Sequence, residues 1–244
     1  MPFDTSSRPP QPYSVRPPQA APYQADSAER TFIASVYRWM ALGLVVTAAV
    51  AWGIASSEAA IQFVILNRWV YIGLIIAQFG LVVAISAMVQ RLSAPAAGAM
   101  FLGYSALTGA TLSVILLVYT AASITLAFTI TAGTFAAMSV YGTVTRRDLT
   151  SWSSFLMMGL FGVVIAGLVN IFLQSSMMSF VISCAAVVVF TGLTAYDTQK
   201  LRAYAAQGGG TIAAAAPVAG ALTLYLDFIN LFLAILRLVG DRRK

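Results

Sequence analysis

Apolar residues fill seven long runs of this chain, and short polar stretches separate them. Each run approaches the roughly 20 residues that a helix needs to cross the hydrocarbon layer of a bilayer. An eighth apolar run, 60–66, is too short to cross and is expected to lie at the membrane interface. The pattern therefore predicts seven transmembrane helices, at about residues 35–55, 69–90, 97–119, 123–145, 155–173, 178–196 and 217–239.

The segments outside these runs have the composition of tails and linkers. Seven of the nine prolines lie in the first 22 residues, and such a polar, proline-rich stretch cannot bury a core. We expect residues 1–30 to be a disordered tail, residues 31–240 to form the transmembrane domain and residues 241–244 to be a basic C-terminal tail. The glycines at 208–210 are expected to form a flexible linker before the last helix.

Composition supports the same class. Hydrophobic residues make up 59% of the chain and charged residues 9%, whereas a soluble domain carries about 25% charged residues. The chain is therefore expected to be an all-α polytopic membrane protein, with the lipid bilayer as its first partner. The formal net charge of +6 does not indicate nucleic acid, because the basic residues lie singly or in small groups between apolar runs, as topology signals do.

Lysine and arginine placement predicts the orientation of the chain. A cytoplasmic N-terminus leaves Arg68 as the one basic residue on the outer loops. It also places Arg237 and residues 242–244 at the outer end, against the positive-inside rule, so the last segment either crosses despite its charges or re-enters. The inner side then holds the other basic residues: Arg8, Arg16, Arg30, Arg38, Arg91, Arg146, Arg147, Lys200 and Arg202.

The side chains that most catalytic and metal sites need are missing. The sequence has no histidine, and Cys184 is its one cysteine, which excludes His-ligated zinc, Ser–His or Cys–His catalysis and an intramolecular disulfide. An aspartyl intramembrane protease needs two carboxylates at similar depth, but the glycine-x-glycine-aspartate pattern of that class is absent around Asp197 and Asp227. We expect neither enzyme activity nor a bound cofactor.

Two acidic residues stand out because they interrupt apolar runs. Asp197 lies in TGLTAYDTQKLR and Asp227 in ALTLYLDFINLF, whereas the other six acids fall in the N-terminal tail, the loops or the C-terminus. An ionised carboxylate in the hydrocarbon layer is costly, so such residues usually face a bundle interior or a water-filled cavity and mark ion or proton paths. Asp197 and Asp227 are the candidate functional residues.

The placement of these acids predicts a small cluster near the inner end of the bundle. Thr223, Asp227, Asn230 and Arg237 recur at helical spacing and form one polar stripe on the last helix. Asp197 is expected at the inner end of the sixth helix and Arg91 at the inner end of the second. The two carboxylates and Arg91 can therefore converge, with Arg91 clamping one carboxylate as a latch.

Two carboxylates in contact cannot both ionise cheaply, so we expect the pair to share a proton and to titrate as a unit. Loss of the proton would separate the two helices and leave two anionic ligands, and oxygen ligands of this kind suit calcium. Since calcium prefers six to eight oxygens, we expect weak binding of calcium as a permeating ion, with Thr223 and Asn230 as supporting polar groups.

Simpler interpretations exist for two of these residues. Asp197 at a helix end beside basic residues is more often a membrane-boundary residue than a functional one, and Arg91 by itself is most simply a positive-inside anchor. Asp227 is different, because no charged neighbour in the sequence compensates a carboxylate so deep in an apolar run. Function explains it better than structure does.

Two segments resemble a known family. FTGLTAYDTQKLR at 190–202 and ALTLYLDFINLFLAILRLVG at 221–240 look like the signatures of the transmembrane Bax inhibitor motif family, the Bax inhibitor-1-like proteins. The resemblance implies a seven-helix fold with the last helix central, and a pH-dependent calcium leak in bacterial members. It also implies that Asp197 and Asp227 are the aspartate pair of the family, and that Arg91 is the arginine that pairs with an aspartate in the closed form.

The sequence therefore favours a bacterial inner-membrane protein that forms a pH-sensitive calcium leak. The resemblance also implies a second role, in which a non-conducting protein regulates a membrane protease or a stress or cell-death pathway through a protein partner. The sequence does not decide between these functions, and it does not give the oligomeric state.

Overall fold

The computed structural model describes residues 22–207 and 213–243, with side chains for residues 27–206 and 213–243. The described chain is helical and contains no strand, and a single isolated bridge joins Tyr119 to Arg242. Seven helices are long and apolar enough to cross a membrane, as the sequence predicts. In order, the elements are α1 (Pro22–Ala55), α2 (Glu58–Ile61), the π-helical turn η1 (Gln62–Leu66), α3 (Arg68–Met88), α4 (Ala94–Val118), α5 (Ala121–Val144), the 3₁₀ turn η2 (Leu149–Trp152), α6 (Ser153–Leu173), α7 (Ser176–Gln207) and α8 (Ala216–Val239).

Two helices are longer than the apolar runs that predicted them. α1 begins at Pro22, so residues 22–30 are its first turns and not part of the tail. α7 continues past residue 196 to Gln207. Both extensions are polar but hold good helix formers and no internal glycine or proline, so the helix continues where hydrophobicity falls. The rest of the predicted tail and the glycines at 208–210 lie outside the described residues.

Side-chain caps fix several of the turns between helices. The Ser93 hydroxyl accepts from the backbone N–H of Ala96 at the start of α4, and the Thr120 hydroxyl accepts from Ser123 at the start of α5. The Asp148 carboxylate accepts a hydrogen bond from the backbone N–H of Thr150, 2.9 Å away. Hydrogen bonding with Thr150 lowers the pKa of Asp148. Such caps satisfy N–H groups that have no partner within their own helix.

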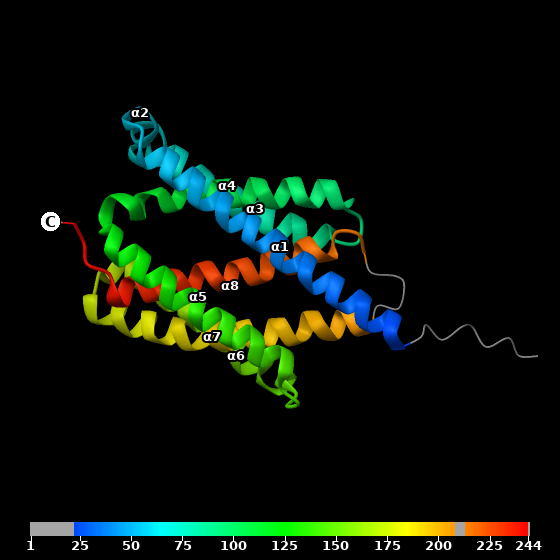
Figure 1. Cartoon of the computed structure of the whole chain (residues 1–244). Coiled ribbons are helices and arrows are strands. Elements are labelled where there is room, and N and C mark those ends of the chain that lie inside the picture. The colour runs from blue at the N-terminus through cyan, green and yellow to red at the C-terminus, as the bar shows by residue number, and fades with distance from the viewer. Residues whose placement is uncertain (1–21, 208–212, 244) are drawn as a thin grey trace, which may run out of the picture.

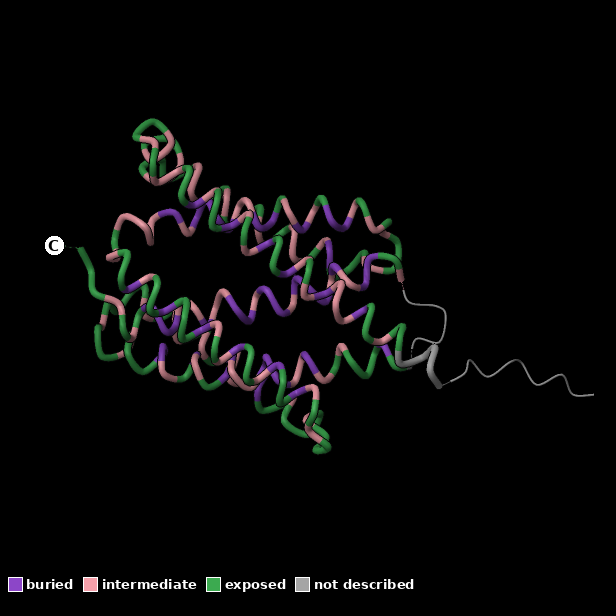
Figure 2. The backbone as a smooth tube through the Cα atoms, in the orientation of Figure 1, coloured by how far each residue is buried: buried purple, intermediate pink, exposed green. Residues whose placement is uncertain are grey.

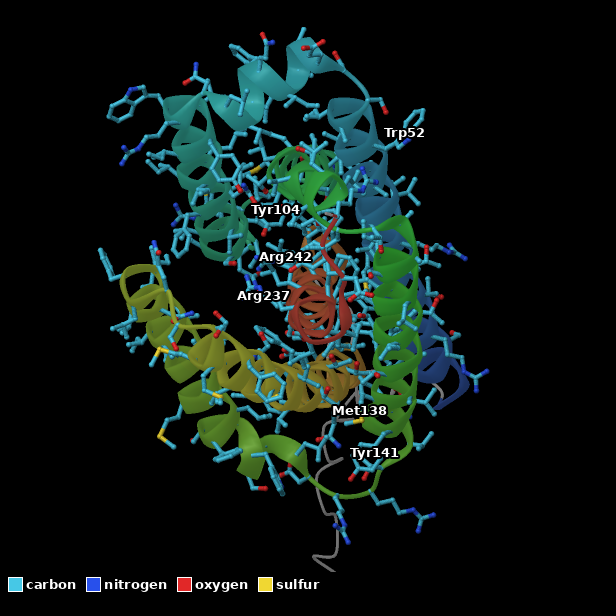
Figure 3. The ribbon with its side chains drawn as sticks, turned by 90° about the vertical axis from the view of Figure 1, so that its left-hand side faces the viewer. Trp52, Tyr104, Met138, Tyr141, Arg237 and Arg242 are labelled. Carbon is cyan, nitrogen blue, oxygen red and sulfur yellow. The ribbon has the colours of Figure 1, made fainter. Side chains whose placement is uncertain are left out.

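α8 lies at the centre of the bundle (Figure 3). More than half of its residues are buried, whereas Ile85 is the buried residue of α3 and Leu156 that of α6. Both apolar core clusters include side chains from α8, and α1, α5 and α7 contact it (Figure 2). The fold expected from the family resemblance, with a central last helix, is therefore confirmed.

α8 runs through the whole bundle without a break. It begins at the end where α1 begins, which we call the N-terminal end, and finishes at the opposite end, which we call the C-terminal end (Figure 1). There the chain after α8 is tied to the α4–α5 turn, because Arg243 N–H donates to Val118 and Thr120 N–H donates to Asp241. α8 is long and apolar enough to cross a membrane and has no break at which it would re-enter, which favours the first of the two possibilities open from sequence.

Close contact between α5 and α7 depends on a glycine. A Cβ at Gly142 would collide with the backbone carbonyl of Ala195, two residues before Asp197. Gly133, also on α5, is exposed and has no neighbour within 4 Å of such an atom. The two glycines of one helix therefore differ in what a methyl group would meet.

We expect Gly142→Ala to destabilise the bundle by about 1–3 kcal/mol, because α5 must move away from α7. The matched Gly133→Ala should leave stability unchanged or raise it slightly, since alanine is the better helix former. Thermal unfolding of the detergent-solubilised variants measures both effects. Equal unfolding temperatures for the two variants would contradict the close contact.

Candidate functional site

Asp227 is the buried acid of the structure. It lies on α8 with 4% of its surface exposed, between the buried Tyr225 and Phe228. Its Oδ2 atom accepts no hydrogen bond from any described residue. A carboxylate that is buried without donors is costly unless another group compensates it, so its neighbours decide its chemistry.

That neighbour is Asp197. Its carboxyl group lies within hydrogen-bonding reach of the Asp227 carboxyl group and is itself half-buried on α7. α7 and α8 contact one another along the bundle, with opposite directions. Because the two carboxyl groups approach one another, the acids share one depth, with Asp197 about 15 Å from the end of α7 at Gln207 and Asp227 about 16 Å from the start of α8 at Ala216.

The contact determines what the pair can do chemically. Two carboxylates are acceptors only, so a hydrogen bond between them requires one shared proton. Lys200, one turn further along α7, also acts electrostatically on Asp197, and its ammonium group lies 5.8 Å from the centre of the Tyr196 ring. The pair can therefore exist as a hydrogen-bonded unit with one proton or, without it, as two adjacent anions.

Several hydroxyls in this part of the bundle also lack partners. The buried side-chain oxygens of Ser139 on α5 and of Thr191 and Thr198 on α7 make no hydrogen bond to a described residue. Thr198 directly follows Asp197. Sequence reasoning missed these residues, although the spacing of seven between Thr191 and Thr198 marks one face of a helix.

The structure does not bring Arg91 to the pair. Arg91 follows the end of α3, is exposed, and forms no ion pair within residues 27–207 and 213–243. The arginine that does bridge helices at this end is Arg202, which pairs with Glu29 and donates to the carbonyl of Thr143. The convergence of two carboxylates is observed here, and the Arg91 latch stays a prediction.

The polar stripe of α8 divides between two environments. Thr223 donates to the carbonyl of Ala219, and Asn230 donates to that of Leu226, so neither makes the contact between helices that a polar residue in a bundle often makes. Asn230 and Arg237 line a cavity between α3, α4 and α8, whereas Asp227 faces α7. The four polar residues have the predicted helical spacing, but they do not face one common surface.

A buried hydroxyl pair holds α8 against α1. The hydroxyls of Tyr225 and Thr47 lie 2.6 Å apart, and Thr47 also contacts the carbonyl of Ser105 on α4, at 2.9 Å. Tyr225 is fully buried and meets the rings of Phe101 and Tyr104 edge-on. The sequence signal for this contact was the position of Tyr225, two residues before Asp227.

The described residues contain no group of three or more acidic, cysteine or histidine side chains that could hold a metal ion. The aspartate pair supplies two carboxyl groups, fewer ligands than calcium takes in a tight site. Any cation bound here would need carbonyl or water oxygens in addition.

Comparison with known proteins gives one family. The family model described as "Inhibitor of apoptosis-promoting Bax1" matches residues 29–244. The chain is 51% identical over 217 residues to "Inner membrane protein YbhL" of Escherichia coli strain K12, which covers 88% of this chain and 93% of the relative. It is 47% identical to an uncharacterized protein of Borreliella burgdorferi, over 87% of this chain and 93% of the relative. An uncharacterized protein of Deinococcus radiodurans is also 47% identical, over 87% of this chain and 91% of the relative.

We expect Tyr225→Phe to destabilise the protein by about 1 kcal/mol, because it removes one buried hydrogen bond between α8 and α1. Tyr204→Phe is the control, since Tyr204 is exposed and its hydroxyl makes no hydrogen bond to a described residue. Thermal unfolding compares the two variants with the unmodified protein. An effect of the same size at Tyr204 would show that the buried contact is not responsible.

Proposed function

This chain belongs to the family of inhibitors of apoptosis-promoting Bax1, and on that premise we propose that it is a pH-sensitive calcium leak of the bacterial inner membrane. The seven apolar helices and the name of the Escherichia coli relative support the compartment. The positive-inside rule supports a cytoplasmic N-terminus, so that the N-terminal end of the bundle faces the cytoplasm. No catalytic step or cofactor enters the proposal.

One observation carries the proposal: two acids on neighbouring helices meet at one depth inside an otherwise apolar bundle. A single buried acid can be held neutral at little cost to function, but a pair in contact makes helix association depend on a proton. Among the acids of the described bundle, this pair lies deepest. An ion that crosses along α8 would pass it.

The shared proton gives the expected sign of the pH dependence. While the proton is present, the carboxyl groups of Asp197 and Asp227 hydrogen-bond and hold α7 against α8. When the proton leaves, the two anions repel in a region of low dielectric constant and the helices separate. The separated carboxylates become ligands for a hard cation, so the leak should increase as pH rises.

A cavity provides part of a route to the pair. About 590 Å³ of space lies between α3, α4 and α8, and its lining on α8 extends from Arg237 inward to Leu226, beside Asp227. Asp197 and Asp227 are not among its lining residues. In this arrangement the cavity ends at the level of the pair, which is consistent with a closed state. Two carboxylates with few further ligands suit passage of calcium better than its storage.

The proposal is tested by calcium flux into dye-loaded liposomes that carry the purified protein, between pH 6 and 8. We expect flux to increase with pH in the unmodified protein, because the proton leaves the pair. Asp197→Asn and Asp227→Asn should each abolish the pH dependence, since an amide cannot share that proton. Asp148→Asn, a loop acid outside the helices, is the control and should behave like the unmodified protein.

Two outcomes of this experiment would contradict the proposal. Flux that decreases as pH rises would exclude gating by repulsion within the pair. No flux above that of protein-free liposomes at any pH would favour the other function implied by the family, a non-conducting regulator of a membrane protease or of a stress or cell-death pathway.

The Arg91 latch requires a second arrangement, in which α3 brings Arg91 to one of the carboxylates. If that arrangement is populated, Arg91→Gln should move the pH at which flux is half-maximal, because one ionised state of the pair loses its cation. Arg30→Gln removes an exposed arginine at the same end of the bundle and should leave that pH unchanged. Identical profiles for the two variants would remove Arg91 from the mechanism.

A further inference from the structure

Two arginines at the C-terminal end of the bundle have no acidic partner. Arg237 lies in the last turn of α8 and Arg242 three residues beyond that helix, and neither forms an ion pair within the part of the chain that the structure describes. A cation in the last turn of a helix interacts favourably with its free carbonyls, which explains a basic residue at Arg237. This interaction with the helix end leaves the N–H donors of the Arg237 guanidinium group free to bind an anion.

Both arginines open onto hollow space. Arg237 and Tyr119 line the cavity of about 590 Å³ between α3, α4 and α8 and also a second cavity, of about 470 Å³, which Arg242 shares. The second cavity lies against the α6–α7 turn. Figure 3 shows Arg237 and Arg242 beside the opening between α3 on one side and the pair α6 and α7 on the other.

The position of Arg242 is fixed by the backbone. Residues 119 and 242 form the isolated antiparallel bridge, and Arg243 N–H donates to the carbonyl of Val118, 2.8 Å away. The chain after α8 is therefore held on the α4–α5 turn. Both arginines therefore extend from backbone segments that the bundle holds in place, one in α8 and one on the α4–α5 turn.

The first cavity is lined mainly by apolar side chains, although Gln78, Thr108 and Asn230 also line it. Ile75 and Phe79 on α3 line it together with Leu233 on α8, and both α3 residues are exposed. Since α3 is a membrane-spanning helix on the outside of the bundle, this wall borders the acyl chains of the bilayer. The cavity therefore offers space for a hydrocarbon chain that ends at a cationic group.

The depth of Arg237 corresponds to the headgroup region. At 1.5 Å per residue it lies about 3 Å before the end of α8. Trp52 near the end of α1 and Trp69 at the start of α3 are strongly exposed at this same end of the bundle, as aromatic residues at a membrane interface are. We therefore expect Arg237 to lie at the level of the lipid phosphates.

We propose that this end of the bundle binds a phospholipid, with the phosphate between Arg237 and Arg242 and one acyl chain in the cavity between α3, α4 and α8. Guanidinium groups recognise phosphate through paired, charge-assisted hydrogen bonds. A free phosphate would use the same donors but would leave the apolar cavity unfilled, which is why a lipid is the better match. The acyl chain would occupy the cavity that the proposed calcium route uses, so a bound lipid would obstruct that route, but lipid binding itself can be tested without calcium transport.

Native mass spectrometry of the detergent-solubilised full chain tests this site. The probes are phosphatidylglycerol, a diacylglycerol with the same chains but no phosphate, and inorganic phosphate. We expect phosphatidylglycerol to bind and Arg237→Gln and Arg242→Gln each to weaken binding about tenfold. Arg237→Lys should weaken it less than Arg237→Gln, because the charge stays but the paired hydrogen bonds are lost. Diacylglycerol should bind at least tenfold more weakly, and inorganic phosphate should not displace the lipid.

Arg68→Gln is the matched control. Arg68 is exposed at the start of α3, at the same end of the bundle, and lines neither cavity. Equal weakening by Arg68→Gln would show a general charge effect and overturn the site. Unchanged binding in both Arg237→Gln and Arg242→Gln, equal binding of diacylglycerol, or displacement by inorganic phosphate would each overturn it as well.

Discussion

The contact between the carboxyl groups of Asp197 and Asp227 is the constraint to which the rest of the bundle conforms. Two acids inside an apolar bundle are costly as separate charges, and less so as a hydrogen-bonded pair that holds one proton. In the proposed function, the pair links the association of α7 and α8 to proton binding. No basic side chain of the described structure forms an ion pair with either acid, so the proton is the compensating charge that the geometry favours.

Packing elsewhere places the two acids at the same depth. The hydroxyls of Tyr225 and Thr47 fix α8 against α1, and Gly142 allows α5 to approach the backbone of α7 at Ala195, close to Asp197. α8 fills the centre of the bundle. The same helix carries Asp227 in the middle and Arg237 in its last turn.

Much of this structure could be predicted from the order of apolar and polar residues. The seven crossing helices follow from hydrophobic length, and Asp227 was identifiable because no sequence neighbour compensates it. The surroundings of Asp197 were not predictable in the same way, because the helix continues through the polar residues up to Gln207 and Asp197 is not at its end. The position of Arg91 depends on how α3 meets the other helices, which periodicity does not specify. Periodicity likewise identified the polar residues on one face of α8. It did not show that Asp227 faces α7 whereas Asn230 lines the cavity.

Infrared spectroscopy of the protonated carboxyl group would examine the shared proton itself. The unmodified protein, titrated between pH 8 and pH 6 in liposomes, should develop the carbonyl stretch of a protonated carboxylic acid. Asp197→Asn and Asp227→Asn should each change the frequency of the band and the pH at which it appears, because a shared proton belongs to the pair and not to one residue. A band with unchanged frequency and unchanged pH dependence in either single variant would contradict the shared proton and the gating that depends on it.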